Sequence, residues 1–194
     1  MNKAQLTSFI QHNSNAPSPI VREIAEQFQE KIIAKNDYLL KDGKVNNDYY
    51  FLAEGFMRAF TFDTEGNEVT TYFYQKNRTV FEVSSFFLRV PSTESIQAVT
   101  ECRGYFITYE ALNNLFHTTP VFREFGRAML VKEFAAFKQR TLALINKSAE
   151  ERYADLIATN NDLFKYAQLK HIASYLGITD TSLSRIRREF LKKS

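Results

Sequence analysis

Apolar residues follow different periods along the chain, and each period predicts a different kind of structure. Up to about residue 30 they recur at helical spacing, with Ile20, Ile24 and Phe28 on one face. Ser18 is expected to cap this helix, because a hydroxyl before a periodic run can accept a bond from a backbone N–H of the first turn. The chain is therefore expected to open with helices.

From Lys31 to about Tyr109 the pattern changes to short aromatic and β-branched runs. Turn signals separate these runs: "KDG" at 41–43, "AEG" at 53–55 and "DTEGN" at 63–67. Many short strands at this spacing are typical of an antiparallel sandwich or barrel. Aromatic residues fall on both faces of several runs, so the predicted sheet is covered on more than one side.

After Glu110 the helical period returns, and residues 121–145 contain no proline and one glycine. Two neighbouring apolar stripes run along this predicted helix: Leu130, Phe134, Phe137, Thr141 and Leu144, and beside them Val131, Ala135, Leu142 and Ile145. One interpretation is a single broad stripe that packs only on its own domain. We favour the other, in which one face covers the β-domain and the other forms a dimer seam.

A new helix is predicted after residue 148, because Ser148 and Glu151 have the spacing of a capping box. "TNND" at 159–162 is expected to end that helix. We therefore place a domain boundary near Asn146. It separates a domain of residues 1–146, whose dimerisation helix spans about 119–146, from a second domain of residues 147–194.

The stretch "HIASYLGITDTSLSRIRREF" at 171–190 has the pattern of a helix-turn-helix. Gly177 suits the turn, Ile178 the apolar plug beneath it, and Thr179 or Asp180 the cap of the second helix. The expected buried residues are Ile172, Ala173, Leu176, Leu183 and Ile186. The candidate DNA-binding residues are Thr181, Ser182, Ser184, Arg185, Arg187 and Arg188, with Gln168 and Lys170 before them. Arginine can bridge two acceptors of guanine, and hydroxyls can bond bases or phosphates. The alternative interpretation is an ordinary amphipathic helical hairpin whose charged side chains are simply solvated.

Charge supports a polyanionic partner for the end of the chain. The formal charge is +3 overall, but residues 165–194 hold seven basic and two acidic residues, a net +5, which leaves −2 for the rest. The single cysteine, Cys102, excludes an internal disulfide framework and fits a reducing compartment. We see neither a signal peptide nor a membrane span, and expect a cytoplasmic protein.

With a β-roll, a long central helix and the C-terminal "IASYLGITDTSLSRIRREF", the sequence resembles the Crp/Fnr (cyclic-AMP receptor protein-like) family of transcription regulators. The resemblance implies an α+β fold with an N-terminal antiparallel β-roll, a dimerisation helix and a C-terminal helix-turn-helix. It also implies a homodimer that reads pseudo-palindromic double-stranded DNA, a contact with RNA polymerase and a small-molecule effector. Arg185 matches the family's recognition-helix arginine.

The effector site departs from the family's cyclic-nucleotide pattern, in which Gly-Glu is followed ten residues after the Glu by Arg-Ser. Here Phe81 precedes Glu82, and Ser92 and Thr93 stand where Arg-Ser is expected. A buried cyclic phosphate needs a cation, and Arg89 or Arg103 could supply it only if the loop were rebuilt. The candidate ligand-binding residues are Glu82, Arg89, Ser92 and Thr93. We therefore do not expect cyclic AMP to be the effector; Phe86 and Phe87 either fill the pocket or shape it for a more apolar ligand.

Other classes of protein fit the residues less well. Small β-barrels also house metal-dependent enzymes, but His12, His117 and His171 fall in three separate predicted helical regions, so no metal site is expected. One cysteine excludes an iron–sulfur cluster, and no cofactor or catalytic residue is expected. Few residues separate the capping-box helix from the first helix of the motif, and few follow Phe190, so the family's wing is expected to be reduced or absent. A dimeric sensor or docking module that does not read DNA stays an open alternative.

Overall fold

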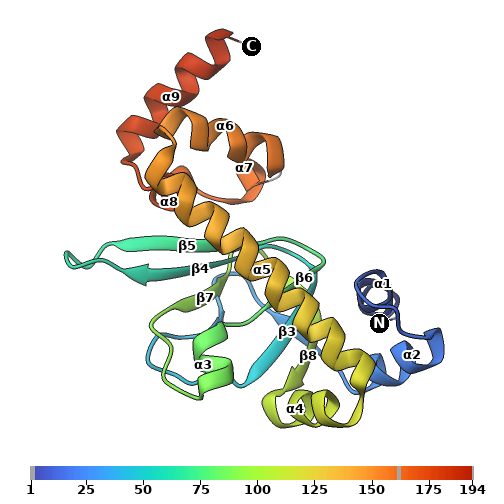
Figure 1. The fold of residues 1–194 in the computed structure, drawn as a ribbon. Coiled ribbons are helices and arrows are strands. Elements are labelled where there is room, and N and C mark those ends of the chain that lie inside the picture. Colours follow the sequence, from blue (N-terminus) through green and yellow to red (C-terminus); the bar gives the residue numbers. More distant parts are fainter. Residues whose placement is uncertain (1–2, 161–162, 194) are drawn as a thin grey trace. The chain divides into compact units, whose positions relative to one another are not determined.

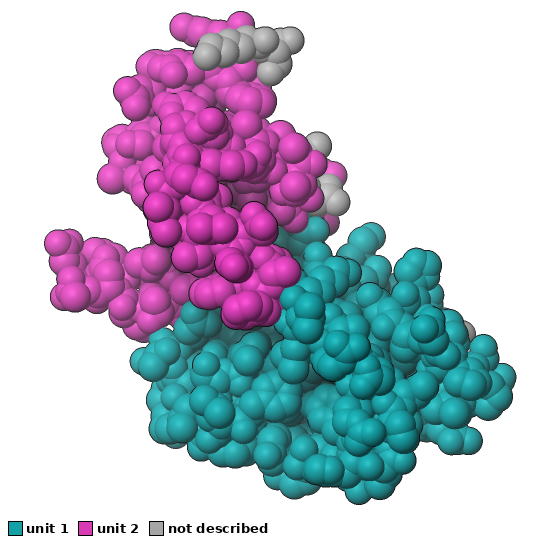
Figure 2. All heavy atoms as spheres, viewed as in Figure 1, with its two compact units in different colours: residues 1–59, 73–133 teal, residues 60–72, 134–194 magenta. Residues whose placement is uncertain are grey.

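The computed structural model describes residues 3–160 and 163–193, except for the side chain of Lys193 (Figure 1). These residues form two compact units (Figure 2). Unit 1 comprises residues up to 59 together with 73–133, and unit 2 comprises 60–72 together with the chain from 134 onward. The boundary near Asn146 stays a prediction. None of the helices in the described ranges is long and apolar enough to cross a membrane.

Eight short strands occupy the region for which the sequence predicts a β-domain. They are β1 (Gln29–Ile33), β2 (Tyr38–Leu40), β3 (Asp48–Glu54), β4 (Met57–Phe62), β5 (Glu68–Tyr74), β6 (Arg78–Val80), β7 (Ser95–Ala98) and β8 (Cys102–Thr108). They make two four-stranded sheets in the orders β1-β8-β3-β6 and β2-β7-β4-β5. The pairs β1–β8, β3–β8, β3–β6 and β2–β7 are antiparallel. The expected antiparallel β-roll fold is therefore confirmed.

Helices precede and follow these strands in the sequence, and one short helix lies between β6 and β7. The helices are α1 (Ala4–His12), α2 (Ser18–Glu26), α3 (Val83–Leu88), α4 (Tyr109–Thr118), α5 (Pro120–Asn146), α6 (Ala149–Thr159), α7 (Leu163–Tyr166), α8 (Leu169–Tyr175) and α9 (Asp180–Lys193). The 27-residue α5 matches the long helix that the sequence predicts for about 119–146. "TNND" does end α6, although Asn161 and Asp162 lie outside the described residues.

Two local predictions were wrong. Ser18 does not cap α2: it is the first helical residue, Pro17 holds the cap position, and the Ser18 hydroxyl bonds Gln11 instead. The run "VSSFFL" is helix α3 inside the β-domain. Glu82 starts this helix, because its carboxylate accepts hydrogen bonds from the backbone N–H groups of Ser84 and Ser85. Six residues are too few to show a helical period, so the sequence did not reveal this capped helical turn.

The core of unit 1 lies between β3, β8 and the helices α1, α2, α4 and the first half of α5. Phe122, Phe125 and Met129 bury one side of α5, and Phe51 of β3 is fully enclosed in the same cluster. Phe9 of α1 packs on both Phe51 and Phe125, with ring centroids 5.0 and 6.0 Å apart. Burial of these large apolar side chains supplies the main stabilising force of the unit.

Candidate nucleic-acid interface

Helices α8 and α9 of unit 2 form the helix-turn-helix, and glycine makes the turn between them. Gly177 has a φ of +67°, a conformation that costs other residues about 1–2 kcal/mol. The backbone N–H of Gly177 donates to Ser174 O, and that of Ile178 donates to Ala173 O, each at 3.0 Å. These two bonds form a Schellman motif, so the turn ends α8 through its own backbone.

Apolar residues hold the two helices together as the sequence predicts. The predicted buried residues Ile172, Ala173, Leu176, Leu183 and Ile186 are all at most 4% exposed. Tyr153 of α6 packs edge-on against Phe164 and Phe190, which attaches the end of α9 to the rest of the unit. Position and tilt of α9 are thus set by a small, fully enclosed core.

The opposite side of α9 is polar and exposed. Thr181, Arg185, Arg188 and Lys192 recur at steps of four, three and four, which places them on one face, away from the buried Leu183. Among the other candidate residues, Ser184, Gln168 and Lys170 are exposed, whereas Ser182 and Arg187 are half-buried. The structure thus brings hydroxyl and guanidinium groups together on the outer surface of α9.

Thr179 organises the start of α9. Its hydroxyl accepts the backbone N–H of Ser182 at 3.2 Å, so Thr179 caps the helix and Asp180 is its first residue. The same hydroxyl lies 3.0 Å from the hydroxyls of Thr181 and Ser182. Two of the predicted base-reading hydroxyls are therefore already held in place by hydrogen bonds before any ligand arrives.

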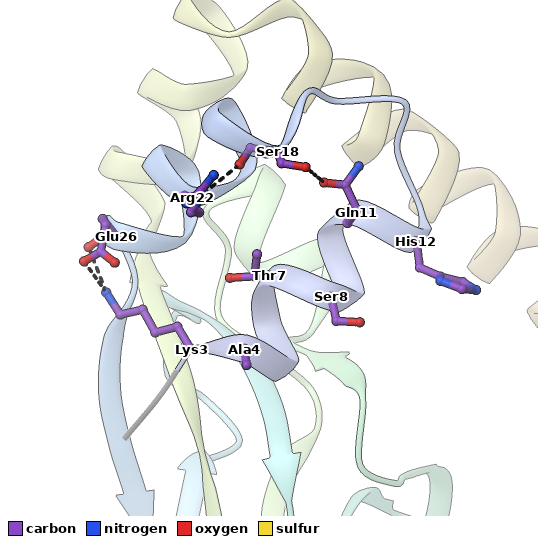
Figure 3. A pocket seen from close by; sticks show the side chains of 9 residues that line it. All are labelled: Lys3, Ala4, Thr7, Ser8, Gln11, His12, Ser18, Arg22 and Glu26. Atoms are coloured by element: carbon purple, nitrogen blue, oxygen red, sulfur yellow. Dashed lines mark hydrogen bonds and ion pairs between the residues drawn. The ribbon is translucent and has the colours of Figure 1, made fainter.

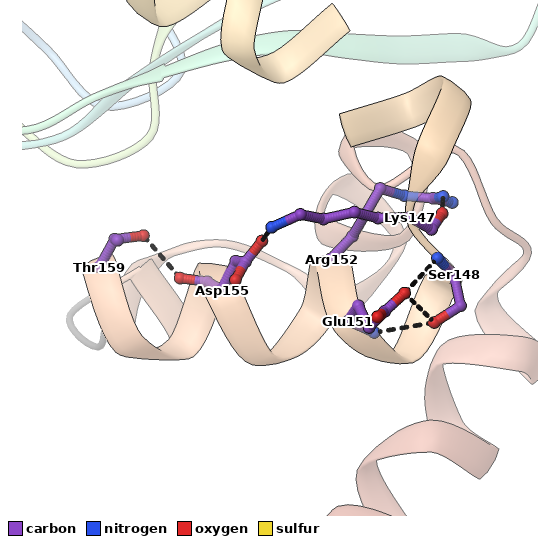
Figure 4. Close-up of polar contacts among 6 residues, drawn as sticks. All are labelled: Lys147, Ser148, Glu151, Arg152, Asp155 and Thr159. Carbon is purple, nitrogen blue, oxygen red and sulfur yellow. Dashed lines mark hydrogen bonds and ion pairs between the residues drawn. The ribbon is translucent and has the colours of Figure 1, made fainter. Parts of the chain in front are cut away.

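Helix α6 supplies the support beneath this motif. Ser148 and Glu151 form the predicted capping box: Glu151 N donates to Ser148 Oγ at 3.2 Å, and Ser148 N donates to Glu151 Oε2 at 2.8 Å (Figure 4). Hydrogen bonds from Ser148 hold the pKa of the Glu151 carboxyl below its usual value. The short helix α7 follows α6. The described residues that come after β8 in the sequence form helices and contain no strand.

The outer surface of α5 carries the apolar stripes that the sequence assigns to a dimer seam. Phe134 is 69% exposed, Phe137 62% and Ile145 77%. Leu130, Val131, Leu142 and Leu144 are also exposed. Most apolar side chains of both stripes are therefore exposed to solvent in this structure. A row of exposed large apolar residues along one helix marks a surface suited to another apolar surface.

In unit 1, the polar groups of the predicted ligand set bond to the protein itself. The Glu82 carboxylate caps α3, as described above. The Arg89 guanidinium donates to Asn46 O at 2.8 Å and to the side chain of Asn47, and it stacks on the Tyr109 ring at 4.2 Å. Ser92 is buried, and its hydroxyl donates to Glu94 O at 2.8 Å. Thr93 is exposed.

An aromatic cluster occupies the interior beside α3. Phe86 is fully buried, and its ring centroid lies 5.2–6.1 Å from those of Phe87, Tyr109, Phe81 and Tyr49. Burial raises the pKa of Tyr49 to about 12. The sequence left two alternatives for Phe86 and Phe87, and the structure agrees with the first, because the ring of Phe86 fills this space.

A separate pocket of about 800 Å³ lies along α1 and α2 at the surface of unit 1 (Figure 3). Lys3 and Glu26 form an ion pair of 3.2 Å there, and Ser18 bonds Gln11. None of the predicted site residues lines this pocket. Its polar groups join the two N-terminal helices to each other.

Comparison with known proteins agrees with this architecture. Residues 30–119 match the family model described as the cyclic nucleotide-binding domain. The fumarate and nitrate reduction regulatory protein of Vibrio cholerae is 24% identical over 176 residues, which cover 84% of this chain and 69% of that protein. The structure of FixK2 from Bradyrhizobium japonicum superposes with a TM-score of 0.71 at 17% identity, over 86% of this chain and 85% of that one. A regulator from Eubacterium rectale assigned to the Crp/Fnr family has a TM-score of 0.69 at 14% identity, over 92% of this chain and 85% of that one.

The resemblance to the Crp/Fnr family that the sequence indicates is thus confirmed. The matched domain contains Glu82 of the cyclic-nucleotide pattern but uses that carboxylate as a helix cap. The similar proteins from Vibrio cholerae and Eubacterium rectale are both named as regulators. The three histidines lie in three different helices, as predicted: His12 in α1, His117 in α4 and His171 in α8.

The sequence did not reveal several residues that hold the helix-turn-helix in place. Hairpin residue Thr70 is buried and donates its backbone N–H to Ser174 Oγ of α8 at 3.1 Å. Arg140 and Arg152 donate to backbone carbonyls at the end of α8. Each of the two arginines reads in the sequence as an ordinary charge on an amphipathic helix, and no local signal marks its partner.

Proposed function

We propose that the protein is a homodimeric, sequence-specific DNA-binding transcription regulator that is not controlled by cyclic AMP. The exposed face of α9 is the observation that carries the proposal. It presents Thr181, Arg185 and Arg188 on a helix whose other side is fixed by Leu183 and Ile186. Arginine and hydroxyl groups at the start of a recognition helix suit hydrogen bonding to base edges and phosphates in a major groove.

The exposed stripes of α5 support the dimer. Two copies packed along Phe134, Phe137 and Ile145 would remove large apolar surfaces from water. The two recognition helices would then enter successive major grooves about 34 Å apart on a pseudo-palindromic site. A reader of this kind would work in the cytoplasm, alongside the chromosome, and would contact RNA polymerase to act on transcription.

A selection from random duplex DNA at near-physiological salt tests the reader function. Enrichment of an inverted repeat with half-sites about one helical turn apart is the expected result. A folded, dimeric protein that enriches no sequence would instead favour the docking-module alternative. Arg185→Ala serves as the matched variant, because it removes one exposed guanidinium from the reading face and leaves the core of α9 intact.

The effector proposal rests on the engaged residues of unit 1. With Arg89 bonded to Asn46 and Asn47, and with Ser92 turned to Glu94, the region near α3 presents its polar groups to the protein rather than to a cyclic phosphate. An unpaired phosphate in such an apolar interior would be costly. Calorimetric titration with cyclic AMP is therefore expected to show no binding, and a micromolar dissociation constant would contradict the proposal.

A further inference from the structure

Two arginines complete the hydrogen bonding at the C-terminal end of α8. A helix leaves its last four carbonyl groups without partners inside the helix. In α8 the turn residues Gly177 and Ile178 satisfy the carbonyls of Ser174 and Ala173 through the Schellman motif. The carbonyls of Tyr175 and Leu176 come next, and both accept hydrogen bonds from arginine side chains of other helices.

Arg140 reaches this end from α5. Its Nη2 donates to Tyr175 O at 3.0 Å, and its guanidinium lies over the Tyr175 ring at 4.2 Å from the centroid. The hydrogen bond fixes the distance between Arg140 and Tyr175, and the stacking fixes the plane of the guanidinium. Arg140 therefore holds the end of α8 in one orientation relative to the turn of α5 that contains Arg140. Arg140 lies in the half of α5 that belongs to unit 2.

Arg152 reaches the same end from α6. Its Nε and Nη2 both donate to Leu176 O, at 3.1 and 2.9 Å, and its Nη1 donates to Lys147 O at 2.6 Å. Lys147 follows directly after α5, so a single guanidinium joins the end of α5 to the end of α8. Gly177 lies against α5 as well: a Cβ at this position would stand 3.5 Å from Leu144 Cδ2.

We propose that Arg140 and Arg152 are positioning residues that set the distance between half-sites in the DNA. The inference rests on the proposed function, in which α5 forms the dimer seam and α9 reads the groove. Since the two arginines tie the turn before α9 to the end of α5, they determine how far each recognition helix lies from the dimer axis. One base pair changes the position of a half-site by about 3.4 Å and about 34°. A rigid junction therefore selects one spacer length.

The experiment compares operators that share the same half-sites but differ in spacer by one base pair. For the wild type we expect a wrong spacer to cost roughly as much as a base mismatch, about tenfold in affinity. Arg140→Ala and Arg152→Ala, alone and together, should reduce this preference, in the double variant to about twofold. Arg140→Lys keeps the charge without the planar stacking and should restore only part of the preference.

Lys147→Ala is the matched control. Lys147 lies at the same junction, and its side chain pairs with Asp155 of α6 at 2.7 Å (Figure 4). This variant should keep the spacer preference of the wild type. If the folded arginine variants also keep the single preferred spacer, the inference is overturned while the proposed function stands. If the wild type binds no operator above random DNA, the proposed function fails, and the spacer role fails with it.

A second measurement shows whether the variants have lost positioning or merely folding. Spin labels at Lys138→Cys on α5 and Glu189→Cys on α9, diluted with unlabelled protein, report one distance within a single chain. Both positions are exposed, and the native Cys102 is buried. We expect a narrow distance distribution for the wild type and for Lys147→Ala, and a broadened one for the folded arginine variants. An unchanged narrow distribution in those variants would also overturn the inference.

Discussion

The predicted effector region of unit 1 and the recognition face of unit 2 contain similar polar side chains that are used in opposite ways. Near α3, Glu82 caps a helix and Arg89 bonds Asn46 and stacks on Tyr109. On α9, Arg185 and Arg188 point away from a sealed apolar core. The same residue types therefore stabilise the fold in one region and face outward in the other.

The difference shows why residue type alone does not define a binding site. A guanidinium that already donates to backbone carbonyls must give up those bonds before it can hold a phosphate, and each costs about 0.5–1.5 kcal/mol net. An exposed guanidinium exchanges only water for its ligand. Substitutions near α3 are thus expected to change stability, whereas substitutions on the outer face of α9 should change DNA binding.

The largest effect is expected at the centre of the aromatic cluster. Phe86→Ala should lower the free energy of unfolding by about 3–5 kcal/mol, because it removes a fully buried ring and leaves a cavity. Leu88→Ala is the matched control in the same helix; since Leu88 is 71% exposed, a change within about 0.5 kcal/mol is expected. Urea denaturation followed by circular dichroism measures both. Similar losses in the two variants would contradict the assignment of Phe86 to the core.

Next in size is the effect of Arg185→Ala on DNA binding. It should weaken operator binding by about 1–3 kcal/mol and relax base choice at one position in each half-site. Its stability should stay within about 0.5 kcal/mol of the wild type, since the side chain is exposed. Binding assays on operator variants at several salt concentrations provide the measurement.

Lys192→Ala is the companion to this variant, because Lys192 lies on the same face one turn beyond Arg188. It should weaken binding to all DNA sequences alike. It should also reduce the salt dependence of the affinity by the amount expected for about one phosphate contact. Lys193 would serve the same purpose, but its side chain lies outside the described residues. Equal effects of Arg185→Ala and Lys192→Ala on every sequence would contradict the division between base reading and phosphate contact.

A smaller effect on stability is expected for Arg89→Ala. The variant loses hydrogen bonds to Asn46 and Asn47 and the stacking on Tyr109, which together suggest a cost of about 1–2 kcal/mol. Arg103→Ala removes an exposed arginine that pairs with Glu101 and should change stability much less. Thermal unfolding with and without cyclic AMP checks both points. A cyclic-AMP stabilisation that vanishes in Arg89→Ala would reassign this arginine to ligand binding.

The smallest effect concerns the pH dependence of the capping box. Hydrogen bonds from Ser148 lower the pKa of Glu151 in the folded state, so its contribution is complete above the ordinary carboxyl pKa and is lost as pH falls through the lowered value. Glu151→Gln keeps a capping residue but removes the titration. The difference in unfolding free energy between wild type and variant should therefore shrink between neutral and acidic pH. A difference that is constant with pH would contradict the prediction.

Local signals account for the features that the sequence predicted well. The Gly177 turn, the Ser148–Glu151 capping box and the spacing of Leu183 and Ile186 all depend on residues within a few positions of one another. The long α5 was also predictable, because its apolar period persists over many turns. The α3 helix was not predictable in this way, since its six residues are too few to show a period and its capping carboxylate was interpreted as part of a ligand site.

The amino-acid sequence by itself determined the succession of opening helices, β-domain and long helix, the helix-turn-helix, and the exposed positions Thr181, Arg185 and Arg188 of α9, because helical periodicity and turn chemistry are short-range properties. Only the tertiary structure decided which polar groups are already bonded: Arg89 to Asn46, and Arg140 to the carbonyl of Tyr175. These partners lie 43 and 35 positions apart in the chain. Packing of distant segments brings them together, and no spacing rule along the sequence describes that step.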